Sequence, residues 1–177
     1  PGRSMEKERS KVEKFIADKK PIVISVNYAP EDIEVTGIFL TKAKRYTQLV
    51  SDLHRSINKG KPILATSNVT KIEGDFPYVL NYSSLIDRDT EIIDNSLIML
   101  LKVLLRMKVS TVSLAGFDGY SKRASNYFDE SREYSFAKSK ADYLNAYVKD
   151  FLNRIKDEMT VNFITKTRYE WQGKDGE

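Results

Sequence analysis

Five short apolar runs, each followed by a small polar residue or by glycine, constrain the fold of this chain most. The runs cover residues 22–26, 38–40, 63–66, 78–80 and 111–115, and they are followed by Asn27, Thr41, Ser67, Asn81 and Gly116. Near-continuous apolar segments of this length are typical of strands that are buried on both faces of a parallel sheet. Open α/β sheets bind ligands at the carboxyl ends of their strands. The pattern therefore predicts an α/β protein that holds a small polar molecule along one edge.

Helical periodicity fills the stretches between these strands. Apolar side chains recur at helical spacing in residues 5–19, 42–57, 95–107 and 134–157. The helix at 95–107 is apolar nearly all round, so we expect it to be fully buried, with Asp94 as its N-cap. Strands are expected at residues 22–26, 34–40, 63–66, 78–81, 111–115 and 161–164. The alternation predicts a three-layer fold, a mostly parallel twisted sheet with helices on both faces, in one domain spanning residues 1–177.

Composition narrows the classes of function. The 177 residues contain no cysteine and a single histidine, His54, which excludes thiolate chemistry and suits a cytoplasmic protein. His54 lies on an amphipathic helix, where a packed or exposed position is favoured over a catalytic role. No apolar run approaches the roughly 20 residues of a membrane span, so no membrane partner is expected. The net charge of +4 favours phosphates, while no nucleic-acid motif accompanies it.

The first five residues, Pro1-Gly2-Arg3-Ser4-Met5, stand directly before a predicted helix. Gly2 allows a ligand to approach the backbone, and the free amides at a helix start favour a phosphate. Ser4 offers a hydroxyl to the same ligand. A simple turn with Ser4 as a helix cap explains the segment equally well. Because the chain opens on proline rather than methionine, we expect it to be a fragment or a trimmed product.

The segment from Ala115 to Tyr120 is the stronger signal for a site. A buried strand ends, Gly116 opens the backbone, and the carboxylate of Asp118 follows. Asp118 is a candidate acceptor for the hydroxyls of a ribose or a sugar, or a group that orients a partner side chain. The alternative is a loop in which Asp118 caps local amides and Gly119 adopts a positive φ. We favour the functional interpretation, because Asp118 is expected to share its edge with Asn27 and Asn81.

Further candidates lie at the start of the buried helix and in the loop after Gly119. Asn95 and Ser96 offer polar groups at a positive helix end, although an N-cap explains them as well. Lys122 and Arg123 are candidates for phosphate contacts, with a solvated loop tip as the commoner explanation. An aromatic lid over a base, or a hydrophobic patch that closes the domain, is a further candidate, formed by Tyr127, Phe128, Tyr134 and Phe136. Trp171 is a candidate docking contact.

These residues resemble a known family. The strand end at Asn27, the segment Phe39-Leu40-Thr41, the helix start at Asp94-Asn95-Ser96 and the loop after Leu114 are similar to a Rossmann-like family that includes bacterial sialyltransferases and MptE-like 6-hydroxymethylpterin diphosphokinases. Members begin with a strand and a G-x-G-P-S-L type loop, and the first five residues here resemble the end of that loop.

A closer resemblance is to the C-terminal domain of 4-hydroxy-2-oxovalerate aldolase-like proteins. In these proteins a Rossmann-like domain follows an aldolase barrel, often in surface-carbohydrate gene settings. The resemblance implies that residues 1–177 are a C-terminal fragment whose first strand lies just upstream of Pro1. It also implies an aldolase barrel as a partner within the same parent chain.

The resemblance assigns ligand contacts to particular residues. Gly2, Ser4 and Asn27 are implied to contact the phosphate and ribose of a nucleotide. Four further residues are implied to face the ligand or to shape its pocket: Asn95, Ser96, Asp118 and Tyr120. Sialyltransferases carry a late histidine as general base, whereas no histidine follows Tyr120 here, and they have asparagine where Thr41 stands. The comparison therefore favours nucleotide or sugar-phosphate binding over sialyl transfer.

Three hypotheses for function follow. The first is a domain of an aldolase-type lyase that binds a nucleotide or an activated sugar. The second is a glycosyl- or diphospho-transferase, in which Asp118 or Asp129 is the catalytic base or a ligand for Mg²⁺ bound with a nucleotide. The third is an interaction module that sets the oligomeric state of the barrel. No protein-held metal site is expected from the sequence.

Overall fold

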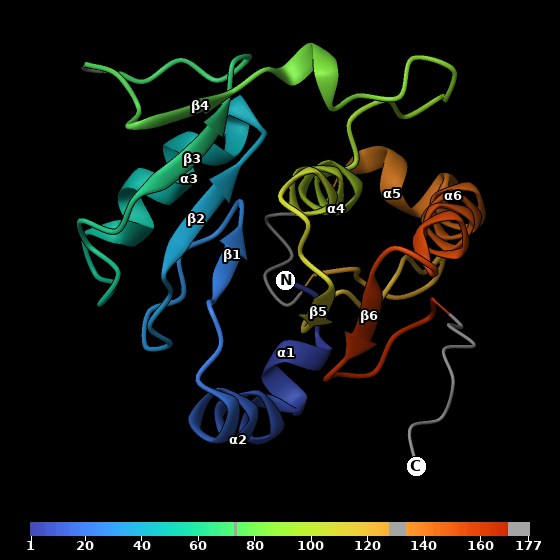
Figure 1. The fold of residues 1–177 in the computed structure, drawn as a ribbon, viewed down its shortest axis with the longest axis horizontal. Coiled ribbons are helices and arrows are strands. Elements are labelled where there is room, and N and C mark those ends of the chain that lie inside the picture. Colours follow the sequence, from blue (N-terminus) through green and yellow to red (C-terminus); the bar gives the residue numbers. More distant parts are fainter. Residues whose placement is uncertain (73, 128–133, 170–177) are drawn as a thin grey trace. The chain divides into compact units, whose positions relative to one another are not determined.

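The protein is α/β and Rossmann-like, and every strand pair in the described part of the chain is parallel (Figure 1). The computed structural model describes residues 1–72, 74–127 and 134–169. The chain divides into two compact units. We call Pro21–Val103 the central unit, and Pro1–Lys20 with Leu104–Glu177 the terminal unit. The expectation of one domain over the whole chain stays a prediction.

The central unit contains a four-stranded sheet in the order β1-β2-β3-β4. Its strands are β1 (Ile24–Val26), β2 (Gly37–Leu40), β3 (Ile63–Thr66) and β4 (Tyr78–Leu80). Its helices are α3 (Ala43–Leu53), the 3₁₀ turn η1 (Tyr82–Ser84) and the first part of α4 (Ser96–Arg106). All four strands run in one direction, so their carboxyl ends lie at one edge of the sheet. This edge is where the polar residues that follow the apolar runs are placed.

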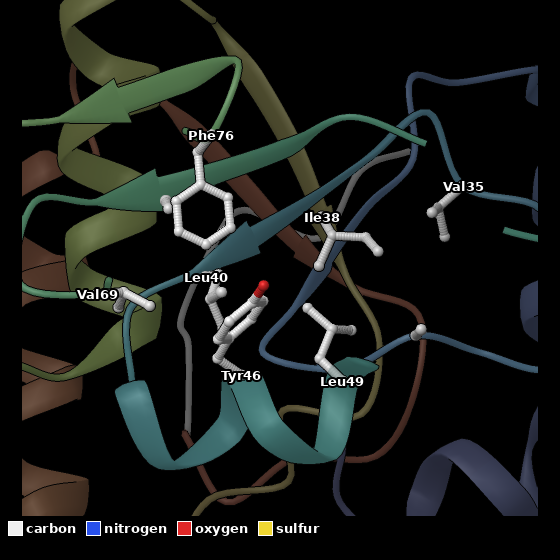
Figure 2. Close-up of a cluster of buried hydrophobic side chains, with 9 residues drawn as sticks. Val35, Ile38, Leu40, Tyr46, Leu49, Val69 and Phe76 are labelled. Carbon is white, nitrogen blue, oxygen red and sulfur yellow. The ribbon is translucent and has the colours of Figure 1, made fainter. Parts of the chain in front are cut away.

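The core of the central unit lies between α3 and one face of the sheet. Figure 2 shows Tyr46 and Leu49 of α3 directed toward Ile38 and Leu40 of β2. Alternate residues of a strand face opposite sides, so Phe39 points away from this cluster, yet it is also fully buried. Both faces of β2 are therefore covered, as its uninterrupted apolar sequence predicts.

The terminal unit contains the parallel pair β5 (Thr111–Leu114) and β6 (Thr160–Phe163). Its helices are α1 (Ser4–Lys7), α2 (Arg9–Lys19), α5 (Ser135–Ser139) and α6 (Ala141–Ile155), with the last turn of α4. Helix α6 buries one apolar stripe, formed by Leu144, Val148, Phe151, Leu152 and Ile155. No helix among the described residues combines the length and the hydropathy that a bilayer crossing requires.

Three expected helices differ from those in the structure, and in two cases hydrogen bonds to distant residues account for the difference. The helix expected at 42–57 ends at Leu53, because the following residues bond to the loop after β1, as in Ile57 N–H to Glu31 O at 3.1 Å. The helix expected at 5–19 is broken at Glu8, whose carboxylate accepts the N–H of Lys166 at 2.9 Å.

The helix expected at 134–157 is divided into α5 and α6 at Lys140, without a proline or glycine to mark the break. Helix α4 is buried at Leu97–Leu101 as expected, but it ends with Arg106 exposed and is followed by Met107, which is 67% exposed. A fully buried helix is therefore wrong for its last turn. Apolar composition alone does not reveal where the cover over a helix ends.

Candidate functional site

A cluster of amide and hydroxyl groups lies at the carboxyl edge of the four-stranded sheet. Asn27 follows β1 with a left-handed backbone, φ +54°, which asparagine tolerates better than most residues. Its Nδ2 donates to Ser96 Oγ at 2.9 Å, and its Oδ1 accepts the N–H of Thr41 at 2.8 Å. The hydroxyls of Thr41 and Ser96 lie 2.7 Å apart. We call Asn27, Thr41 and Ser96 the amide–hydroxyl cluster.

Thr66, the last residue of β3, and Asn68, just after it, extend this cluster. Asn68 Nδ2 donates to the carbonyl oxygen of Thr41 at 3.0 Å, and the Thr66 hydroxyl donates to Asn68 Oδ1 at 2.6 Å. Thr41 and Thr66 are fully buried, whereas Asn68 is exposed. Neither Thr66 nor Asn68 is among the site residues that the sequence predicts. The signal was present, since both stand at the polar end of an apolar run.

The start of α4 is capped by Asn95 rather than by the expected Asp94. Asn95 Oδ1 accepts the N–H groups of Leu97 and Ile98 at 3.1 and 3.3 Å. An N-cap acceptor satisfies the amides of the first turn, which explains why asparagine holds this position. Asp94 instead forms an ion pair with Lys42 and accepts a hydrogen bond from the hydroxyl of Tyr82 at 3.2 Å.

The edge of the central unit is chemically suited to a hydroxyl-rich or phosphate-bearing molecule. Hydroxyl and amide groups both donate and accept hydrogen bonds, so they can match ribose or sugar hydroxyls in either direction. Asn27 and Ser96 are half-buried, which leaves part of the cluster open to solvent. Burial raises the pKa of Tyr82, and the charge of Asp94 raises it further, so the phenol stays a neutral donor at physiological pH.

The terminal unit holds a second polar cluster, formed by Ser4, Asp118 and Thr165. The carboxylate of Asp118 accepts the N–H of Ser4 at 2.8 Å on one oxygen and the Ser4 hydroxyl on the other. Ser4 Oγ lies 2.8 Å from Thr165 Oγ1, which also accepts the N–H of Gly116 at 2.9 Å. Ser4 and Thr165 are buried. The amide that Asp118 accepts is thus 114 positions away along the chain, whereas the positive φ expected for Gly119 is present, at +79°.

Gly2 and Gly116 are required here by contacts within the protein. A Cβ on Gly2 would stand 2.5 and 2.6 Å from the two carboxylate oxygens of Asp118. Gly116 has φ +72°, and a Cβ there would stand 2.9 Å from that of Pro1. The N–H of Gly2 donates to the carbonyl of Gly116 at 2.7 Å. The groups that lie closest to the two glycines therefore belong to the protein itself: the Asp118 carboxylate at Gly2, and Pro1 at Gly116.

Tyr120 belongs to a group of tyrosines near Asp118. Its backbone is held at both polar atoms by Asn145, which accepts from its N–H and donates to its carbonyl, each at 2.8 Å. Burial raises the pKa of the Tyr120 phenol well above its usual range, and the neighbouring Tyr169 adds to the effect. The pKa of Tyr169 is raised by burial as well, and then by Tyr127 and Asp118. These phenols are neutral hydrogen-bonding groups, unsuited to act as bases.

The predicted site residues thus gather in two sets. The set in the terminal unit consists of Gly2, Ser4, Gly116, Asp118 and Tyr120. The set in the central unit consists of Asn27, Thr41, Asn95 and Ser96. A ligand-binding or catalytic role for any of them, including Asp118 as a base, stays a prediction, and so does an edge shared between the sets. Asp129, Phe128 and Trp171 lie outside the described residues.

The other candidates from the sequence lie outside the two polar clusters. His54 is exposed, Arg123 is exposed, and Lys122 forms an exposed ion pair with Asp142. The ring of Tyr134 stacks on that of Phe136, with centroids 5.4 Å apart, and Phe136 is 41% exposed. Within the described ranges, no three histidine, aspartate or glutamate side chains gather in a way that could hold a metal ion.

Comparison with known proteins does not extend these observations. No protein-family model, no curated protein and no solved structure matches this chain.

Proposed function

We propose that this protein binds a nucleotide or an activated sugar through the amide–hydroxyl cluster of its central unit. The observation that carries the proposal is the convergence of Asn27, Thr41 and Ser96 at the carboxyl edge of a parallel sheet. In open α/β sheets this edge is where ligands are bound. Ribose, sugar hydroxyls and phosphate oxygens are the groups that such a cluster recognises. A magnesium ion, if required, would arrive with the phosphates rather than on a protein site.

The backbone at Asn27 supports a role beyond packing. A non-glycine residue with a positive φ at the end of a strand carries a conformational cost, and such residues concentrate at binding sites. The left-handed turn directs the amide toward both Thr41 and Ser96, which come from different elements. The three side chains hold one another in place through their own hydrogen bonds, so a ligand need not order them on binding.

The sequence resemblance supports the same class of ligand and suggests a setting. A domain that follows an aldolase barrel in proteins of surface-carbohydrate synthesis would have access to activated sugars. We propose that this chain serves such a lyase as a binding domain. The transferase hypothesis has less support, because both oxygens of Asp118 accept hydrogen bonds from Ser4.

A thermal-shift panel of nucleosides, nucleotides and nucleotide sugars tests the proposal. At least one compound is expected to raise the melting temperature of the wild type, and Ser96→Ala should reduce that shift, because the ligand loses one hydrogen bond. The matched control is Ser51→Ala, which removes an exposed hydroxyl of α3 and should leave the shift unchanged. A wild type that responds to no member of the panel would rule the proposal out.

A further inference from the structure

A group of charged and phenolic side chains lies beside the amide–hydroxyl cluster. Lys42 directly follows Thr41, and Asp94 lies two residues before Ser96. The ion pair between Lys42 and Asp94 therefore joins the same two segments as the contact between Thr41 and Ser96. Tyr82, from η1, donates its hydroxyl to the same carboxylate oxygen of Asp94 at 3.2 Å. Three segments of the central unit thus meet at one carboxylate.

The ion pair is partly withdrawn from solvent. The side chains of Lys42 and Asp94 are 25% and 24% exposed, whereas the helix-surface pair Lys14–Asp18 is 76% and 54% exposed. Charges that are partly buried are screened less by water and salt, so each has a stronger need of a partner. The Lys42 ammonium is therefore held close to the cluster by Asp94 rather than free in solution.

Lys42 also lies where a cation is poorly placed for helix stability. It is the N-cap residue of α3, and the first turn of that helix contains no acidic residue. A cation at a helix N-terminus opposes the helix dipole, at a cost of a few tenths of a kcal/mol or more. Stability of α3 would favour serine, threonine or aspartate at this position. The placement of a lysine here therefore points to a purpose other than capping.

We propose that Lys42 is the residue that binds the phosphate of the ligand, and that Asp94 holds it in place until the phosphate takes over. This inference rests on the proposed function and assigns its phosphate contact. A phosphate carries a charge of about −1.5 to −2 and three acceptor oxygens, so it competes with a single carboxylate for one ammonium. Binding then exchanges the pair Lys42–Asp94 for a contact between Lys42 and phosphate.

The exchange gives opposite effects for the two members of the ion pair. Removing the charge of Lys42 takes away the phosphate contact and weakens binding. Removing the charge of Asp94 takes away both the competitor and the like charge near the phosphate, so it strengthens binding. If Asp94 instead accepted hydrogen bonds from ligand hydroxyls, its neutralisation would weaken the binding of hydroxyl-bearing ligands and leave phosphate binding unimproved. The sign of the Asp94 effect therefore distinguishes the two roles.

Isothermal titration of the full chain with inorganic pyrophosphate tests the inference without requiring the base or sugar to be known. Lys42→Gln is expected to weaken binding by about tenfold, the size of a charge-assisted hydrogen bond. Asp94→Asn should strengthen it several-fold. The control Lys44→Gln removes an exposed charge of the same helix, and should change the affinity by less than about twofold. Weaker or unchanged pyrophosphate binding by Asp94→Asn would overturn the inference, as would a wild type that binds no pyrophosphate.

A second measurement, made on the wild type, tests the inference even if Asp94→Asn fails to fold. In the wild type, pyrophosphate should shift the nuclear magnetic resonance signals of the Lys42 side chain and leave those of Lys44 in place. Unmoved Lys42 signals at saturation would contradict the inference. If nucleosides or sugars stabilise the protein but Lys42→Gln binds pyrophosphate as tightly as the wild type, the assignment of Lys42 as the phosphate contact is wrong and the proposed function stands. A panel without any response would overturn the proposed function itself.

Discussion

From the sequence, Gly2 can be explained either by a ligand that approaches the backbone or by a simple turn; the structure shows a contact with another part of the chain. Glycine before a helix suggests close approach of a ligand to the backbone. In the structure the approaching group is the carboxylate of Asp118, which bonds to Ser4 and leaves no room for a Cβ on Gly2. The sequence reveals that something approaches closely here. The partner is separated by more than a hundred residues, so local pattern could not identify it.

Replacing Gly2 by alanine is expected to lower the free energy of unfolding by about 2 kcal/mol, because the new methyl group must displace the Asp118 carboxylate. Urea denaturation measures the loss. In an Asp118→Ala background the carboxylate is gone, so the additional cost of Gly2→Ala should largely disappear. Additive losses in the double variant would show that the two residues do not compete for this space.

The loop between β1 and β2 depends on one buried side chain. Asn58 has no exposed surface, and its Oδ1 accepts the N–H of Val35 at 2.8 Å. Its Nδ2 donates to the carbonyls of Pro30 and Ile33, each at 2.9 Å. The backbone N–H and C=O groups of this loop thereby obtain hydrogen-bond partners from a residue outside the loop. The segment after α3, which ends at Leu53, is joined to the same loop by the hydrogen bond from Ile57 N–H to Glu31 O.

Asn58→Ala should therefore destabilise the protein by about 3 kcal/mol, since it leaves buried backbone groups without partners. Chemical denaturation of the variant gives the value. The matched control is Asn81→Ala, which makes the same change at an exposed position after β4 and should stay within about 0.5 kcal/mol of the wild type. Equal effects at the two positions would contradict the role assigned to Asn58.

Strands were predicted more closely than helices, for a physical reason. The strand expected at 63–66 is confirmed as β3, because Pro62 and the polar residues after Thr66 mark its ends in the sequence itself. The ends of α1 and α3 are determined by bonds to residues far along the chain. The members of the amide–hydroxyl cluster were predictable as polar residues at two strand ends and at the start of a helix. Asp94 was assigned to the wrong partner because local sequence suggests a cap and cannot show Lys42 or Tyr82.

Both units together determine how the protein responds to alkali. The chain has ten tyrosines, and burial raises the pKa of Tyr120 and Tyr169 in the folded state. Above about pH 10 the unfolded chain releases these protons while the folded chain retains them. The stability that they contribute is complete below that pH and is lost as the pH rises further. Burial also raises the pKa of Tyr82 in the central unit, with the same sign.

We expect the free energy of unfolding to fall as the pH increases above about 10, and to fall less steeply in Tyr169→Phe, which has one fewer raised phenol. Denaturation at a series of pH values measures the two slopes. Tyr78→Phe is the control, since Tyr78 is 57% exposed and its replacement should leave the slope as in the wild type. Identical slopes for Tyr169→Phe and the wild type would contradict the assignment.

The division of the chain has a consequence for its biosynthesis. The central unit is one unbroken stretch, Pro21–Val103, whereas the terminal unit needs residues from both ends of the chain. Ser4 and Thr165, whose hydroxyls are bonded, are 161 positions apart. On the ribosome, which adds roughly 5–20 residues per second, the central stretch is available for folding well before β6 emerges. The terminal unit can therefore be completed only after β6 has been translated, whereas Gly116 and Asp118, which bond to Gly2 and Ser4, emerge earlier.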